Sequence, residues 1–266
     1  KILAGKAANS GRVRAKTGGV SLHPSKRTSV VSAKPEGRIL SLELQRIMSL
    51  ERIEDYTPFD VSPIETTECK IQLREVQLKA LSALRQMQGG FFPVGVGHGK
   101  TYISLLAAQA MGKKHAILVL PAPTKHQIEA ECERLRESFN FTSIEITTYG
   151  MLSRDPEGCP LTPLMCGHAA KDCVLIFDEA HRIKRKQSAR TKRVLRFVKA
   201  NQDIAVVCLS GTMTTKSLLE YHHLMLLCLR EKIPLPLKGR ELRSWADSLD
   251  VEGECKWNSL MDMEPL

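Results

Sequence analysis

Short runs of apolar residues alternate along the chain with stretches in which apolar residues recur every three or four positions. The short runs have the length of buried strands, and the stretches between them have helical spacing. Gly89-Gly90 predicts the end of one helix, and Thr124 with Gln127 predicts a capping box at the start of another. This alternation predicts an α/β fold with a central parallel sheet flanked by helices. The strand candidates span 91–96, 115–120, 143–148, 173–178 and 204–209.

The two ends of the chain lack this alternation. Residues 1–38 hold nine Lys and Arg but a single acidic residue, and they predict a basic, flexible N-terminal arm. A nucleic-acid tether and a solvated linker are both compatible with that composition. Residues 39–68 predict a short helix and a connector, 69–230 the α/β domain, and 231–266 an unassigned tail or the start of an interdomain linker. Because the chain begins with Lys1, we expect it to be a fragment or a processed product.

Composition narrows the class of protein. Of the 266 residues, 42% are hydrophobic and 26% charged, which is typical of a globular protein, and no apolar run is long enough to predict a membrane span. The formal net charge of +10 favours a polyanionic partner such as nucleic acid. None of the eight cysteines forms a Cys-x-x-Cys pair, and we expect reduced thiols in an intracellular protein, cytoplasmic or nuclear.

A glycine-rich segment, Val94-Gly95-Val96-Gly97-His98-Gly99-Lys100-Thr101, lies where a predicted strand turns into a helix. Glycines let backbone N–H groups wrap a phosphate, a lysine reaches the β- and γ-phosphates, and a hydroxyl binds Mg²⁺. The strict phosphate-loop pattern has glycine where this chain has Val94. The segment therefore predicts an ATP-binding loop that departs from the pattern at one position.

An acidic pair follows the predicted strand 173–178. Asp178 and Glu179 come at its carboxyl end, which in a parallel sheet lies beside the phosphate loop. There Asp178 is placed to hold Mg²⁺, and Glu179 to orient or deprotonate an attacking water. The pair and the loop together predict ATP hydrolysis.

Together with this loop, the sequence Asp178-Glu179-Ala180-His181 resembles the first RecA-like domain of superfamily 2 helicases and translocases, in which motif II is the DEAH box. The resemblance covers about 69–229. Thr147-Thr148-Tyr149 and His181-Arg182-Ile183-Lys184 are similar to segments of the Snf2-like branch. Leu209-Ser210-Gly211-Thr212 matches the motif that couples the nucleotide state to strand movement.

The resemblance implies a role for each matching residue. Gln77, next to Arg74, would read adenine; Asp178 and Thr101 would hold Mg²⁺; and Glu179 with Lys100 would complete the catalytic set. The implied ATP-binding residues are Arg74, Gln77, Gly97, His98, Gly99, Lys100 and Thr101. The residues implied to couple the nucleotide state to movement are His181, Ser210, Gly211 and Thr212. The residues implied to contact nucleic acid are Pro121, Thr148 and Tyr149.

Two departures from the family pattern shape the expected function. Met213 stands where Snf2-like proteins usually have proline, while Gly211 favours duplex DNA over RNA. The family's second RecA-like domain, which supplies the arginine fingers, has no counterpart in this chain. Arginine fingers are worth about 10³–10⁵ in turnover, so we expect this chain to bind ATP but hydrolyse it weakly by itself.

Two other functions are compatible with the same motifs. A viral DNA-packaging ATPase of the terminase type also pairs a phosphate loop with Asp-Glu, and a nuclease domain would follow it. A nucleotide-gated nucleic-acid-binding module would never turn over, although such a module has no need of Glu179.

The stretch 182–199 is the most basic part of the predicted α/β domain. It holds nine Lys and Arg interleaved with apolar residues that would face the sheet. A phosphate-contacting surface and a solvated helix face are equally compatible with this pattern.

Overall fold

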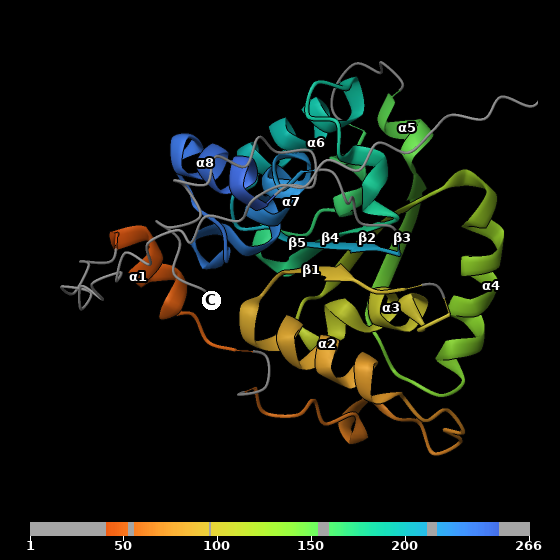
Figure 1. Cartoon of the computed structure of the whole chain (residues 1–266). Coiled ribbons are helices and arrows are strands. Elements are labelled where there is room, and N and C mark those ends of the chain that lie inside the picture. Colours follow the sequence, from red (N-terminus) through yellow and green to blue (C-terminus); the bar gives the residue numbers. More distant parts are fainter. Residues whose placement is uncertain (1–40, 53–55, 96, 154–159, 212–216, 250–266) are drawn as a thin grey trace, which may run out of the picture. The chain divides into compact units, whose positions relative to one another are not determined.

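The computed structural model describes residues 41–52, 56–95, 97–153, 160–211 and 217–249. Five parallel strands form one sheet in the order β1-β5-β4-β2-β3 (Figure 1). This all-parallel sheet flanked by helices is a RecA-like α/β arrangement and confirms the predicted fold class. The strands are β1 (Gly90–Pro93), β2 (His115–Leu120), β3 (Ser143–Thr148), β4 (Cys173–Asp178) and β5 (Ala205–Ser210).

Helices cover both faces of the sheet (Figure 1). One face packs against α2 (Glu75–Met87), α3 (Lys100–Ala110) and α4 (Lys125–Arg136). The other face packs against α5 (Tyr149–Ser153), α6 (Ala189–Ala200) and α7 (Leu219–Leu229). The remaining α-helices are α1 (Leu42–Met48) and α8 (Gly239–Leu249), and short 3₁₀ turns include η6 (Ala180–Ile183) and η7 (Arg230–Lys232).

Alternate residues of each central strand enter different cores. In β4, Val174 and Ile176 pack on the α2–α4 side, whereas Leu175 and Phe177 pack on the α5–α7 side. A strand buried on both faces reads as a continuous apolar run, which is why the sequence revealed these strands clearly. Because the strands are parallel, their carboxyl ends converge on one edge of the sheet.

The helix ends differ in detail from the sequence prediction. The capping box is at α2, where the Gln77 side chain accepts from the backbone N–H of Arg74. At α4 the Thr124 hydroxyl instead donates to the carbonyl of Pro121, so the box predicted there is wrong. Gln88 adopts the left-handed conformation that ends α2, at φ 56°. Gly89 follows because a Cβ there would lie 2.0 Å from a backbone oxygen of α7.

The regions beside the predicted domain pack onto it. Phe59 and Ile64 belong to the core on the α2–α4 side, although the sequence placed them in a connector. In the predicted tail, Leu242 of α8 packs in a small core with Ile233 and Leu235. No described helix is long and apolar enough to cross a membrane. The predicted arm, 1–38, lies outside the described residues.

Helix α1 is fastened to this C-terminal segment by polar contacts. The Arg46 guanidinium donates to the carbonyl oxygens of Glu231, Ile233 and Leu235. The Glu43 carboxylate pairs with Arg46 and accepts from the backbone N–H of Leu237. These contacts join segments almost 190 residues apart in sequence.

Candidate functional site

The glycine-rich loop leaves β1 at the carboxyl edge of the sheet and leads into α3, which begins at Lys100. Gly97 and Gly99 have φ angles of 82° and 74°, a backbone region that favours glycine. The loop therefore ends at a helix N-terminus, whose free N–H groups and positive dipole end suit a phosphate. This is the local structure that the sequence predicted for an ATP-binding loop.

Helix α2 fixes the shape of this loop. Arg74 Nη1 donates to the carbonyl of Gly97 at 2.8 Å, and Gln77 Nε2 donates to that of Gly99 at 3.2 Å. A Cβ at Gly99 would lie only 2.0 Å from Gln77 Nε2, so glycine is needed for this approach. Gln77 is 2% exposed and acts here as a positioning residue. Its reading of adenine remains a prediction.

A cavity of about 660 Å³ opens beside the loop, within the range of about 300–1,000 Å³ usual for small-molecule sites. Its lining includes Arg74, Gln77, Gly97, Gly99, Lys100 and Thr101, all of them predicted ATP-binding residues. The exposed His98 is not among the residues that line it.

The opposite wall of the cavity was not predicted. Tyr102 and Glu131 line it, and Arg134 hydrogen-bonds both side chains. Gln127 and Ile128 of α4 complete this wall. The sequence carries no local signal for the α4 residues, because only the fold brings α4 next to the loop.

The acidic pair faces the loop from the end of β4. Lys100 Nζ lies 3.4 Å from Glu179 Oε1 and donates to the carbonyl of Val94 at 3.3 Å. Glu179 itself is in the left-handed conformation, at φ 56°, which turns the chain sharply after the strand. The structure therefore brings together the three predicted catalytic residues, Lys100, Asp178 and Glu179.

Burial and, to a smaller degree, the neighbouring charge of Glu179 raise the pKa of Asp178 to about 6. Lys100 and the backbone N–H of Glu179 act in the opposite direction. An ionised carboxylate in this position is costly without a cation beside it. Carboxylate and hydroxyl oxygens are ligands that Mg²⁺ accepts, so the residue types of Asp178 and Thr101 fit it.

No group of three or more His, Cys, Asp or Glu that could hold a metal ion occurs within the described ranges. Mg²⁺ in nucleotide sites is usually held by one or two carboxylates together with phosphates and waters, so a set of two protein residues suits it. The described cysteines, Cys69, Cys132, Cys166, Cys173, Cys208 and Cys228, are free thiols, as expected.

His181 connects the acidic turn to β5. Its Nδ1 lies 3.2 Å from Glu179 Oε2 and also 3.2 Å from the hydroxyl of Ser210. Ser210 is fully buried at the end of β5, and Gly211 follows it. Of the predicted coupling residues, the structure thus brings His181 and Ser210 into contact, while Thr212 lies outside the described residues.

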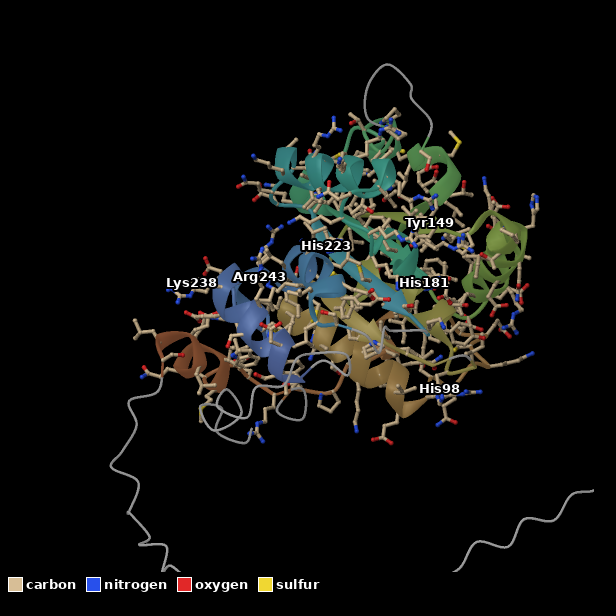
Figure 2. All side chains as sticks on the ribbon, turned by 45° about the horizontal axis from the view of Figure 1, so that its top comes forward. His98, Tyr149, His181, His223, Lys238 and Arg243 are labelled. Atoms are coloured by element: carbon tan, nitrogen blue, oxygen red, sulfur yellow. The ribbon has the colours of Figure 1, made fainter. Side chains whose placement is uncertain are left out.

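The predicted nucleic-acid residues lie near the ends of β2 and β3 and differ in exposure. Pro121 is buried beside the exposed Ala122 and Pro123, and Thr148 is half-buried. Tyr149 is only 2% exposed, and its hydroxyl donates to the Asp178 carbonyl at 2.7 Å. Burial leaves Tyr149, like Pro121, little surface for a nucleic-acid strand, and the contact of both residues with such a strand stays a prediction. Figure 2 shows Tyr149 and His181 on the same side of the molecule.

The similarity of this chain to known proteins is low. The sequence matches no protein-family model and no curated protein. Among solved structures, the Sulfolobus solfataricus SWI2/SNF2 ATPase core in complex with dsDNA is similar, with 20% sequence identity and a TM-score of 0.44. The similarity covers 64% of this chain and 38% of that chain. At this identity and TM-score the likeness supports no statement about the activity of this chain.

Proposed function

We propose that this chain is the ATP-binding motor domain of a Snf2-like superfamily 2 DNA translocase or helicase, which couples ATP hydrolysis to movement on nucleic acid inside the cell. One observation carries the proposal. A continuous set of contacts runs from Lys100 through Glu179 and His181 to Ser210. It links a phosphate loop to a water-activating carboxylate and to a buried hydroxyl on a neighbouring strand.

Each member of this set has a separate task in the proposed reaction. Lys100 and the loop N–H groups bind the ATP phosphates, and Lys100 also holds the Glu179 carboxylate in place at 3.4 Å. Glu179 orients the attacking water and accepts its proton. His181 responds to the charge of Glu179 and passes this change to Ser210.

Asp178 and Thr101 would hold Mg²⁺, which when bound neutralises charge on the phosphates. Tyr149 positions Asp178 by donating to its carbonyl oxygen. The cavity beside the loop has room for the nucleoside part of ATP.

The proposed motor needs a nucleic-acid track and a second RecA-like domain, from elsewhere in the protein or from a partner. The Pro121–Thr124 turn and Thr148, near the carboxyl ends of β2 and β3, would contact the track. Duplex DNA is the proposed track because of Gly211. The second domain would close over the nucleotide cavity and add the arginine that accelerates hydrolysis.

The test is steady-state ATP hydrolysis with duplex DNA, single-stranded DNA, RNA or no polymer, by this chain and by the same chain joined to its second domain. We expect slow hydrolysis by the chain itself and stimulation by duplex DNA in the joined protein. Glu179→Gln should retain ATP binding and lower turnover by about 10²–10⁴-fold. Tight ATP binding without turnover on any polymer would contradict the motor and favour a nucleotide-gated binding module.

A further inference from the structure

A strongly basic surface lies on α6 and the segment before it. Between Arg182 and Lys199 the chain has nine basic residues and no acidic one. Six of the nine are exposed: Arg182, Arg185, Lys186, Lys192, Arg196 and Lys199. We call these six residues the α6 basic face.

The charges of this face are not balanced inside the protein. Lys184 pairs with Glu220 at 3.2 Å, and Arg193 donates to the carbonyl of Leu152. None of the six residues of the α6 basic face forms an ion pair with a carboxylate in the part of the chain that the structure describes. Their positive charges are therefore available to a partner.

Neighbouring positive side chains of the α6 basic face also repel one another. Lys192 and Arg196 are four residues apart on α6, and Arg196 and Lys199 are three apart, so each like-charged pair lies on the same side of the helix. Such pairs destabilise a helix unless an anion lies between them. An ordinary solvated helix avoids this by mixing charges of both signs.

We propose that the α6 basic face binds the phosphate backbone of duplex nucleic acid, as a second contact apart from the track at the ends of β2 and β3. The face presents Lys and Arg but no aromatic side chain, since Phe197 is buried. A surface without aromatic rings lacks the main platform for stacking on unpaired bases, and its Lys and Arg suit contacts with phosphates. Lys192, Arg196 and Lys199 extend over about 10 Å of the helix, which matches about three successive phosphates of one strand.

The position of α6 ties this contact to the nucleotide site. The chain passes directly from the acidic turn into η6, and the Thr191 hydroxyl on α6 donates to the carbonyl of Ile183 at 3.1 Å. Arg193 attaches α6 to α5, which begins at Tyr149. This inference rests on the proposed function in one respect, the choice of nucleic acid as the polyanion that binds the α6 basic face.

The test is equilibrium binding of a short labelled DNA duplex at several salt concentrations. A plot of log affinity against log salt has a negative slope. The triple variant Lys192→Gln/Arg196→Gln/Lys199→Gln should make this slope less steep by about 2–3, since each phosphate that the protein no longer neutralises removes about 0.9 from its magnitude. The matched control, Lys232→Gln/Arg240→Gln/Arg243→Gln, removes the same charge from exposed residues of η7 and α8. Figure 2 shows Arg243 on α8, away from Tyr149 and His181.

We expect the control to keep the wild-type slope, and Lys192→Arg/Lys199→Arg to keep it as well because the charge is unchanged. Equal slopes for the two triple variants would overturn the inference. So would displacement of the duplex by polyglutamate as effectively as by unlabelled duplex, since that result favours an acidic protein partner. Glu179→Gln separates the two proposals, because it should lower turnover by about 10²–10⁴-fold and leave the salt slope unchanged.

Discussion

Helices α4 and α6 are each 12 residues long and pack on opposite faces of the same sheet, yet they handle charge in opposite ways. On α4 charges of both signs occur, and three pairs form within the helix: Lys125–Glu129, His126–Glu129 and Arg134–Glu131. On α6 all five charged residues are basic.

This difference separates a surface that the chain completes by itself from one that needs a partner. The self-paired α4 forms a wall of the nucleotide cavity, where excess charge would compete with the phosphate loop for ATP. The α6 basic face lies beyond the acidic turn, and we propose that its charge serves a larger anion. Local charge pairing thus distinguishes the proposed nucleotide side of the domain from the proposed polymer side.

The largest expected effect separates these two sides directly. Lys100→Ala should weaken ATP binding about 100-fold, close to 3 kcal/mol, because it removes a partly buried cation from the phosphate site. Duplex binding and its salt dependence should stay unchanged. Titration with a fluorescent ATP analogue, beside duplex binding on the same samples, measures both; Lys114→Ala, at the other edge of the sheet, is the control. If Lys100→Ala weakened ATP binding and duplex binding together, the nucleotide side and the polymer side would not be separate.

The acidic turn between the two sides gives the next effect. The pKa of Asp178 is raised from 3.8 to about 6, so the folded state binds the extra proton between these values, and stability falls as the pH rises through that window. Without Mg²⁺, Asp178→Asn should raise the free energy of unfolding by about 1–3 kcal/mol at pH 8 and change it little below pH 4. Urea unfolding in EDTA at both pH values measures this, with the exposed Asp247→Asn as control. If the variant gained the same free energy of unfolding at both pH values, burial of the Asp178 charge would not be the cause of the gain.

Tyr149→Phe tests the link behind the acidic turn. The variant loses the hydrogen bond to the Asp178 carbonyl and should lower the free energy of unfolding by about 1 kcal/mol. Because the ring is buried, the affinity for duplex DNA should not change. A loss of DNA affinity without a loss of stability would instead support the nucleic-acid contact that the sequence predicts for Tyr149.

The smallest effects come from exchanging the charge patterns of the two helices. Arg196→Glu places a carboxylate between Lys192 and Lys199 and should stabilise the fold by about 0.2–0.5 kcal/mol while weakening duplex binding. Glu129→Lys breaks two pairs on α4 and should destabilise the fold by a similar amount with no loss of duplex binding. Thermal unfolding with duplex titration detects both. If Arg196→Glu destabilises the fold, the α6 charges are balanced within the protein after all.

The sequence predicted the parallel sheet, the phosphate loop and the acidic pair because each is encoded locally. A strand buried on both faces must be apolar throughout, and a loop that wraps phosphate must be glycine-rich. The predicted 115–120, 143–148 and 173–178 agree with β2, β3 and β4 residue for residue.

The errors and the missed contacts involve elements distant in sequence. Nothing near Tyr149 reveals that its hydroxyl reaches the end of β4, and nothing near Thr124 reveals that it donates to Pro121 instead of capping α4. Helix α8 was missed because its apolar residues fit only the small core that Ile233 and Leu235 provide. Family resemblance assigned a role to Tyr149, but only the packing shows which of its atoms are accessible.

The contacts of Arg46 and Glu43 with residues 231–237 have a mechanical consequence. Helix α8 packs on α7, while the segment just before α8 is held by α1, so a pull on α8 is divided between two anchors. One anchor leads through α7 to β5 and the other leads to the N-terminal side of the domain. Load applied at α8 is therefore shared between α7 and α1.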